Sequence, residues 1–282
     1  MTCNFMKPSL YTALVCAVII TLSACSKRIY VPNMVNAPVL KEKYEFKGSI
    51  TPTNLQGAFA VTDNIGIMAS GQYLYGFNAA DPANSNDRSD NGNLFDNTTR
   101  GSMIEGGAGY FKPFGPSKKM VFDVYAGYGG GSFKTLAPDY KTGAGVDVND
   151  YTIRNHFSKV FIQPSIGYVH RVVETVFTSR FTIANFYNSS MGTKAFENNP
   201  DEKNKFLRVA DKPVGFYEPA FTVRVGYKYV KFQAQLQFSV PLNDNYDYNN
   251  SVNNVNSYFQ PVAFNMGVAV NLAQWYNQAR SR

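Results

Sequence analysis

Three cysteines offer thiol chemistry: disulfide formation, metal binding or covalent modification. Cys3 and Cys16 lie within an N-terminal stretch whose one charge is Lys7, and Cys25 follows the end of that stretch. A chain that loses this stretch on export keeps Cys25 alone, and a single thiol cannot form an internal disulfide. The pattern therefore favours modification of Cys25.

The first 24 residues have the layout of a secretory signal peptide. Their apolar run, Leu10 to Ala24, is about 15 residues long, whereas a transmembrane helix needs about 20. The residues Leu22-Ser23-Ala24-Cys25 resemble the lipobox of bacterial lipoproteins. That resemblance implies that the Cys25 thiol receives diacylglycerol, that palmitate-type acyl chains anchor the mature chain, and that Ser26, in place of Asp, directs it to the outer membrane.

The two histidines are the candidates for acid–base chemistry. His156 lies near Ser158 on one predicted strand, and His170 falls in a predicted short turn. Residues two apart share a face on every strand, so a His-x-Ser pair alone is a weak sign of a nucleophile and its base. We expect surface histidines and no enzyme, and the alternative is a lipid-modifying enzyme that uses His156. No Cys or His cluster has metal-ligand spacing, so no metal or other cofactor is expected.

Alternation of apolar and polar residues predicts the elements that carry these groups. The clearest runs are Lys231 to Val240 and Val262 to Leu272, each about as long as the 9 to 11 residues with which a tilted strand crosses a bilayer. Weaker runs fill most of the remainder after a segment with Pro32 and Pro38. We expect ten strands, with eight as the alternative, near 44–50, 54–61, 65–77, 100–112, 119–133, 155–169, 172–186, 214–228, 231–240 and 258–272.

Connection lengths alternate between short and long. The short ones are 62–64, 113–118, 170–171 and 229–230, and the long ones are 78–99, 134–154, 187–213 and 241–257, apart from a tight turn at 51–53. Outer-membrane barrels have short periplasmic turns and longer extracellular loops. The pattern therefore predicts long loops outside and both termini in the periplasm.

Charged residues occupy the polar faces of several predicted strands. The lumen of a barrel of eight to ten strands is narrow and largely filled by side chains, so these charges predict a structural network of ion pairs and hydrogen bonds. A proton- or solute-selective pathway is the functional alternative. The expected polar lumen network comprises Glu45, Lys47, Glu105, Asp123, Lys159, Glu174, Arg180, Arg224 and Lys228.

A soluble sandwich or lipocalin-like barrel also alternates, with its aliphatic faces turned inward. The segregation of long and short connections, and the tyrosines near strand ends, favour the membrane barrel with its aromatic girdles. Removal of Lys7 leaves 26 Lys and Arg against 20 Asp and Glu, a modest excess with no block of like charges. Nucleic-acid binding is therefore not expected.

Residues 30–63 carry a resemblance to a family. The stretches are Tyr30-Val31-Pro32-Asn33, Ala37-Pro38, Lys41-Glu42-Lys43 and Leu55 to Asp63. They resemble the start of small outer-membrane β-barrel lipoproteins typical of Bacteroidota, whose function is unknown. The resemblance implies location and fold, and no activity.

The sequence thus predicts an all-β protein with an antiparallel transmembrane up-and-down β-barrel. Its parts are a lipoprotein signal peptide (1–24), a lipidated periplasmic tether (25–43), the outer-membrane barrel (44–276) and a C-terminal tail (277–282). The expected role is structural or surface-interacting, with a narrow solute channel as the alternative. The expected partners are outer-membrane lipid and a protein or surface glycan that contacts the long loops.

Overall fold

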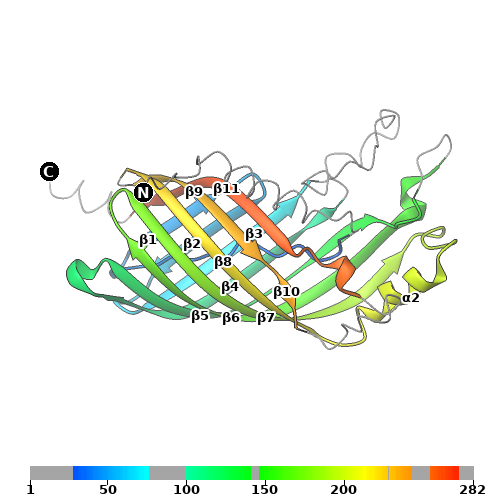
Figure 1. The fold of residues 1–282 in the computed structure, drawn as a ribbon, viewed down its shortest axis with the longest axis horizontal. Coiled ribbons are helices and arrows are strands. Elements are labelled where there is room, and N and C mark those ends of the chain that lie inside the picture. Colours follow the sequence, from blue (N-terminus) through cyan, green and yellow to red (C-terminus); the bar gives the residue numbers. More distant parts are fainter. Residues whose placement is uncertain (1–27, 76–98, 141–145, 228, 243–254, 273–282) are drawn as a thin grey trace, which may run out of the picture.

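The structure, a computed structural model, describes residues 28–75, 99–140, 146–227, 229–242 and 255–272. The signal peptide, Cys25 and the tail at 277–282 lie outside these residues. The described chain forms a closed antiparallel barrel of ten strands with one short helix, so the predicted fold class is confirmed (Figure 1). No helix in this part of the chain has the length and apolarity to cross a membrane.

Every strand pairs with its sequence neighbour except at the seam. The strands are β1 (Phe46–Ile50), β2 (Asn54–Ala60), β3 (Ile65–Leu74), β4 (Arg100–Phe114), β5 (Met120–Leu136), β6 (Thr152–Val169), β7 (Val173–Met191), β8 (Val214–Tyr227), β9 (Val230–Phe238), β10 (Val240–Pro241) and β11 (Val262–Asn271). β10 continues β9 after Ser239 and pairs again with β8. β11 pairs with β9 and with β1, which closes the barrel.

The connections separate by length between the two ends of the barrel. The short-turn end carries residues 61–64, 115–119, 170–172 and 228–229, and the long-connection end carries 75–99, 137–151, 192–213 and 242–261. The tight turn at 51–53 also lies at the long-connection end. Strands β5 to β7 extend further toward this end than predicted, to Leu136, from Thr152 and to Met191. Helix α2 (Pro200–Arg208) lies here too (Figure 1).

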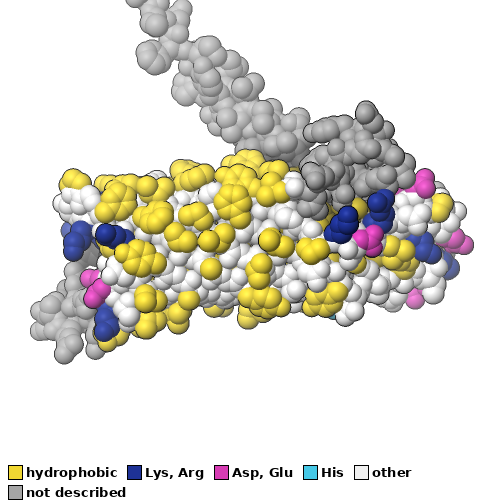
Figure 2. Space-filling view, turned by 90° about the horizontal axis from the view of Figure 1, so that it is seen from below, with side chains coloured by type: hydrophobic (Ala, Val, Ile, Leu, Met, Phe, Trp, Pro, Cys, Tyr) yellow, Lys and Arg dark blue, Asp and Glu magenta, His cyan; other side chains and the backbone are white. Residues whose placement is uncertain are grey.

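The apolar faces of the strands point outward, which settles the direction that alternation leaves open. On β9, Phe232 is 54% exposed, whereas Gln233, Gln235 and Gln237 are fully buried. Figure 2 shows apolar side chains spread over the wall, with charged side chains toward its two ends. The inward aliphatic faces that a soluble sandwich or lipocalin-like barrel needs for its core are therefore not the arrangement of these strands.

Candidate functional site: the occupied lumen

Residues 28–40, called the lumen segment below, run through the inside of the barrel. Every one of them is buried. At one end Ile29 N donates to Tyr258 O at 2.9 Å, and at the other Lys41 N donates to a Glu45 carboxylate oxygen. The sequence predicts a tether over 25–43 that leads to the barrel, whereas the structure places residues 28–40 inside it. The segment is extended, as expected, but it fills the barrel instead of leading to it.

Two prolines help to explain why the segment stays extended in a confined space. Pro32 and Pro38 fix φ and bias the preceding residue toward extended conformations. Each also lacks an N–H group, so each removes one donor that would need a partner inside the barrel. The segment remains free of regular secondary structure over residues 31–41. Its remaining backbone groups must find partners among the strand side chains.

Amide side chains of the wall supply many of these partners. Val35 N donates to Gln235 Oε1 at 2.8 Å, and Gln235 Nε2 donates back to Val35 O at 2.8 Å. Gln56 Nε2 donates to Met34 O at 2.6 Å, and Gln163 Nε2 donates to Asn36 O at 2.7 Å. A primary amide carries both a donor and an acceptor, as a peptide group does. The inward glutamines thus pair with a peptide backbone as a neighbouring strand would.

Charged side chains bind the segment nearer the short-turn end. Val39 N donates to Asp123 Oδ2 at 3.2 Å, and Lys47 Nζ donates to Val39 O at 3.0 Å. Arg224 Nη2 donates to Ala37 O at 2.9 Å. Val39 has φ of 43°, a left-handed conformation that is rare for a β-branched residue. These contacts hold it there, because strained conformations persist where the surroundings over-determine them.

Glu105 is the centre of one ion-pair group in the lumen. Its carboxylate lies 2.9 Å from Lys159 Nζ and 3.1 Å from Arg180 Nη1, and Ser70 Oγ donates to it at 3.1 Å. Arg180 also donates to Gln163 Oε1 through Nε and Nη2, at 3.0 and 2.6 Å. Buried charges are tolerated when they are paired and hydrogen-bonded, which is the arrangement here.

Glu174 forms a second group near the short-turn end. Its carboxylate lies 2.7 Å from Lys231 Nζ, 3.2 Å from Arg224 Nη1 and 3.7 Å from Lys47 Nζ. Lys47 is in turn 3.6 Å from Glu45. One carboxylate thus meets three cations, and one of these cations meets a second carboxylate.

The structure places eight of the nine predicted lumen residues inside the barrel, and Lys228 lies outside the described residues. Among the described residues of the barrel wall, two buried charges were not predicted, Glu218 and Lys231. Glu218 accepts from Tyr30 Oη at 3.0 Å and from Thr182 Oγ1 at 2.7 Å. Lys231 begins the polar face that contains Gln233, so alternation could have identified it. Among the residues that the structure describes from position 45 on, the buried charges are five carboxylates (Glu45, Glu105, Asp123, Glu174, Glu218) and five cations (Lys47, Lys159, Arg180, Arg224, Lys231).

An apolar layer covers the polar network toward the long-connection end, whereas the Glu174 group reaches the short-turn end, where Lys231 Nζ donates to His170 O at 2.8 Å. Toward the long-connection end, the Tyr30 ring stacks on Phe216 at 4.8 Å and meets Phe157 edge-on at 5.3 Å. Toward the short-turn end, Val39 and Leu40 join the cluster that contains Tyr125. A pocket beside the segment, lined in part by Pro38 and Lys231, measures about 20 Å³, room for about one water molecule.

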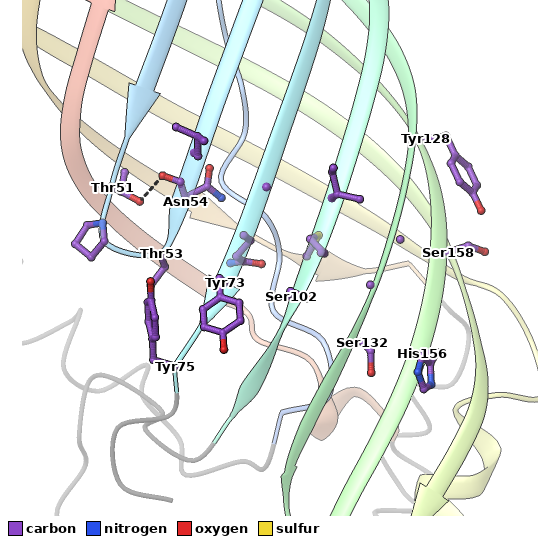
Figure 3. Close-up of a pocket in the computed structure, with 18 of the residues that line it drawn as sticks. Thr51, Thr53, Asn54, Tyr73, Tyr75, Ser102, Tyr128, Ser132, His156 and Ser158 are labelled. Atoms are coloured by element: carbon purple, nitrogen blue, oxygen red, sulfur yellow. Dashed lines mark hydrogen bonds between the residues drawn. The ribbon is translucent and has the colours of Figure 1, made fainter. Parts of the chain in front are cut away.

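A broad open pocket of about 840 Å³ lies at the long-connection end (Figure 3). The strand registers align five of its lining residues in one row across neighbouring strands, on the side nearer the long connections: Tyr73, Ser102, Ser132, His156 and Tyr187. His156 stacks on Tyr187 at 6.0 Å between ring centroids. Its Nδ1 has no hydrogen-bond partner among the described residues.

The row below this one, toward the middle of the barrel, is Gly71, Ile104, Gly130, Ser158 and Asn185. Ser158 and His156 therefore lie in adjacent rows of the same face, because residues two apart on a strand point to the same side. Within the described ranges, no group of three or more His, Cys, Asp or Glu is placed to hold a metal ion.

No protein-family model matches this chain, and no curated protein matches it.

Proposed function

We propose that this chain is an outer-membrane lipoprotein whose barrel is closed by its own N-terminal segment, and that it acts as a non-conducting, non-enzymatic platform for surface contacts. The observation that carries the proposal is the occupied lumen, in which the wall side chains bind the backbone of residues 28–40. The resemblance to Bacteroidota outer-membrane lipoproteins agrees with this location.

The outer face supports a membrane location. On β6, the outward residues from His156 to Tyr168 are aromatic or histidine at the two ends and include Val160, Ile162 and Ile166 between them. These twelve steps, at about 3.4 Å per residue and a tilt of about 40°, span about 31 Å along the barrel axis. The hydrocarbon core of a bilayer is about 30 Å thick. An apolar band of that height between aromatic girdles matches a transmembrane barrel.

The lumen supports the absence of conduction. A solute path needs continuous water, whereas here the buried segment occupies the lumen and an apolar layer covers its polar contacts toward the long-connection end. The ion pairs that could line a pathway neutralise one another instead, as Glu105 does with Lys159 and Arg180. The network thus holds the segment in place, and the narrow channel is the weaker hypothesis.

The long-connection end supports a contact role. The strands β5 to β7 extend there, and α2 packs onto the aromatic layer through Phe206, whose ring lies 6.0 Å from Tyr258. Lys194 and Asp150 join two connections by an ion pair of 3.0 Å. Connections braced in this way present a defined surface, to which a protein or surface glycan could bind.

The surroundings of His156 support the absence of catalysis. Its register neighbours across the sheet are Ser132 and Tyr187. A serine nucleophile with a histidine base is normally completed by an acid that orients the imidazole. Neither neighbour supplies a carboxylate, so we assign His156 to the aromatic girdle.

Recording single-channel currents tests the proposed closed lumen. The purified full chain, inserted in planar bilayers beside an open porin as a positive control, should give no current steps. Reproducible steps of defined size from the full chain would show that the segment leaves a path and would favour the channel.

Metabolic labelling tests the lipid anchor. A palmitate analogue should label the wild-type chain and fail to label Cys25→Ala, since the mature chain keeps no other thiol. Equal labelling of both chains would contradict lipidation at Cys25. Membrane fractionation of the same samples tests the outer-membrane location separately.

A further inference from the structure

The lumen segment has a direction, and each of its contacts fixes a height in the barrel. Thr99 Oγ1 donates to Arg28 O at 3.2 Å, and Gln260 N donates to Tyr30 O at 3.0 Å. Thr99 and Gln260 both belong to long connections. The segment therefore begins at the long-connection end.

The middle and the far end of the segment follow in order. Asn33 Nδ2 donates to Ser70 Oγ at 3.0 Å in the polar layer. Leu40 lies beside Gly66, whose added Cβ would come within 2.9 Å of Leu40 Cδ1, and Gly66 adjoins the short turn at 61–64. The chain then reverses and enters β1. It therefore descends the lumen once, from the long-connection end to the short-turn end, before the first strand begins.

This direction conflicts with the predicted topology. Long loops outside and an N-terminus in the periplasm cannot both hold, because residue 28 lies at the end that carries the long loops. The first strand does start at the short-turn end, as expected. The segment before it comes from the opposite end, which alternation in the strands could not reveal.

Chain length restricts where Cys25 can lie. Cys25 lies three positions before Arg28 in the chain, and three fully extended steps reach about 10 Å at most. The short-turn end lies across a hydrocarbon core of about 30 Å. Cys25 therefore cannot return to the short-turn side while Arg28 holds its contacts with Thr99.

The barrel wall is low on the side where β1 and β2 meet. These strands have five and seven residues, whereas β5, β6 and β7 have seventeen, eighteen and nineteen. Their turn at 51–53 borders the open pocket of Figure 3, where Thr51 Oγ1 donates to Asn54 O. The tall strands on the other side would block a short acylated chain, whereas the low wall gives it a route from the mouth to the bilayer.

We propose that the mature N-terminus lies on the same side of the membrane as the long connections, so that the lipid on Cys25 occupies the leaflet of that side. With the long connections outside, the anchor is in the outer leaflet and the lipoprotein is anchored from the cell surface. This inference rests on the proposed function for the lipid and the membrane, and on the lumen segment for the side.

Thiol labelling of intact cells tests the side. Three single variants of the full chain each place one new thiol: Lys27→Cys at the N-terminus, Asn198→Cys in a long connection and Ser117→Cys in a short turn. Each is treated with a membrane-impermeant maleimide before and after permeabilisation, and the unsubstituted chain is the control. Asn198 and Ser117 are both exposed, so accessibility reports only the side of the membrane.

Lys27→Cys should label as Asn198→Cys does, in intact cells, with Ser117→Cys labelled only after permeabilisation. If Lys27→Cys instead follows Ser117→Cys, the inference is overturned while the proposed function stands. If Asn198→Cys and Lys27→Cys both need permeabilisation and Ser117→Cys does not, the inference stands and the outside location of the long loops fails. Labelling of the unsubstituted chain would show that the Cys25 thiol is free, which contradicts lipidation. The side on which the N-terminus lies would then be read from whether Cys25 itself labels like Asn198→Cys or like Ser117→Cys.

Discussion

Replacement of Gln235 by leucine tests whether the lumen binds the N-terminal segment through its backbone. The side-chain amide makes two hydrogen bonds of 2.8 Å to Val35 and donates a third, of 2.7 Å, to Thr222 Oγ1. Leucine is close to glutamine in size and lacks both the donor and the acceptor. The substitution therefore removes polar contacts with little change in packing.

The expected cost follows from the groups left behind. Val35 N and Val35 O lose the side chain that pairs both of them, in a site where Val35 is fully buried. A buried polar group left without a partner costs about 1–3 kcal/mol, so two such groups give about 2–6 kcal/mol. We expect the free energy of unfolding of Gln235→Leu to fall by an amount in that range.

Gln237 provides a matched control on the same strand and face. It is fully buried, and neither of its amide atoms has a hydrogen-bond partner among the described residues. Gln237→Leu therefore removes a desolvated amide without orphaning a backbone group, and we expect its stability to be unchanged or raised. Gln235 and Gln237 are thus the same residue type, on the same strand and equally buried, and they differ in that Gln235 hydrogen-bonds to the lumen segment.

Guanidinium chloride titration of the refolded protein in detergent micelles, followed by far-UV circular dichroism, measures both variants. The midpoint should fall for Gln235→Leu alone, with the slope unchanged, because a change in midpoint at constant slope reports stability. Equal losses in the two variants would refute the reasoning. They would mean that the inward glutamines act as general lumen filling and do not pair specifically with the segment.

Three other substitutions test separate parts of the structure. Gly66→Ala should destabilise the barrel by about 1–3 kcal/mol in the same titration, because the added Cβ would lie 2.6 Å from Tyr125 Oη. Gly71→Ala, on the same strand, is the control: the heavy atom nearest to its added Cβ is 3.9 Å away, so its stability should not change. His156→Ala should leave lipid composition in expressing cells unchanged by mass spectrometry; a lost lipid product would revive the enzyme hypothesis. Hydrogen bonds from Thr193 and Lys194 lower the pKa of Asp150. The ionised Asp150 carboxylate should therefore stabilise the folded connection above its unfolded-state pKa, and this stabilisation should be lost as the pH falls through the lower folded-state pKa. Proteolysis of the connection at 192–199 should rise over that acidic range in the wild type, and Asp150→Asn should remove most of this pH dependence.

Much of the barrel could be predicted because each wall strand separates two environments. The alternation from Lys231 to Val240 and from Val262 to Leu272 requires one apolar and one polar face, and the strands form there. At the long-connection end, β5 to β7 extend three to five residues beyond their predicted boundaries. The inner face is already aromatic at Phe133, Phe157 and Phe186, and residues beyond them, such as Thr135 and Ser190, no longer alternate apolar with polar. Local pattern thus locates a strand only where its two sides differ.

The occupied lumen could not be predicted from local pattern. An extended segment with Pro32 and Pro38 has the same local sequence pattern in solvent as in a lumen, because neither environment imposes a hydrophobic periodicity on the residues. A signal did exist in composition: Ile29, Val31 and Val35 are too apolar for a solvated tether. The inward charges were predicted from strand alternation, but their partners were not, since Val39 and Asp123 meet across 84 residues of chain.

Some contacts of the lumen segment join the beginning of the chain to its last third, which bears on the order of folding. Val35 lies near the start of the chain, and Gln235 follows 200 residues later. Contacts so distant in sequence form slowly, because the entropy of closing the loop is lost before the contact gains anything. The seam beside them is narrow, since β1 and β11 share four paired positions. We therefore expect the lumen segment to be inside before β11 pairs with β1, so that closing the barrel and enclosing the segment are one step.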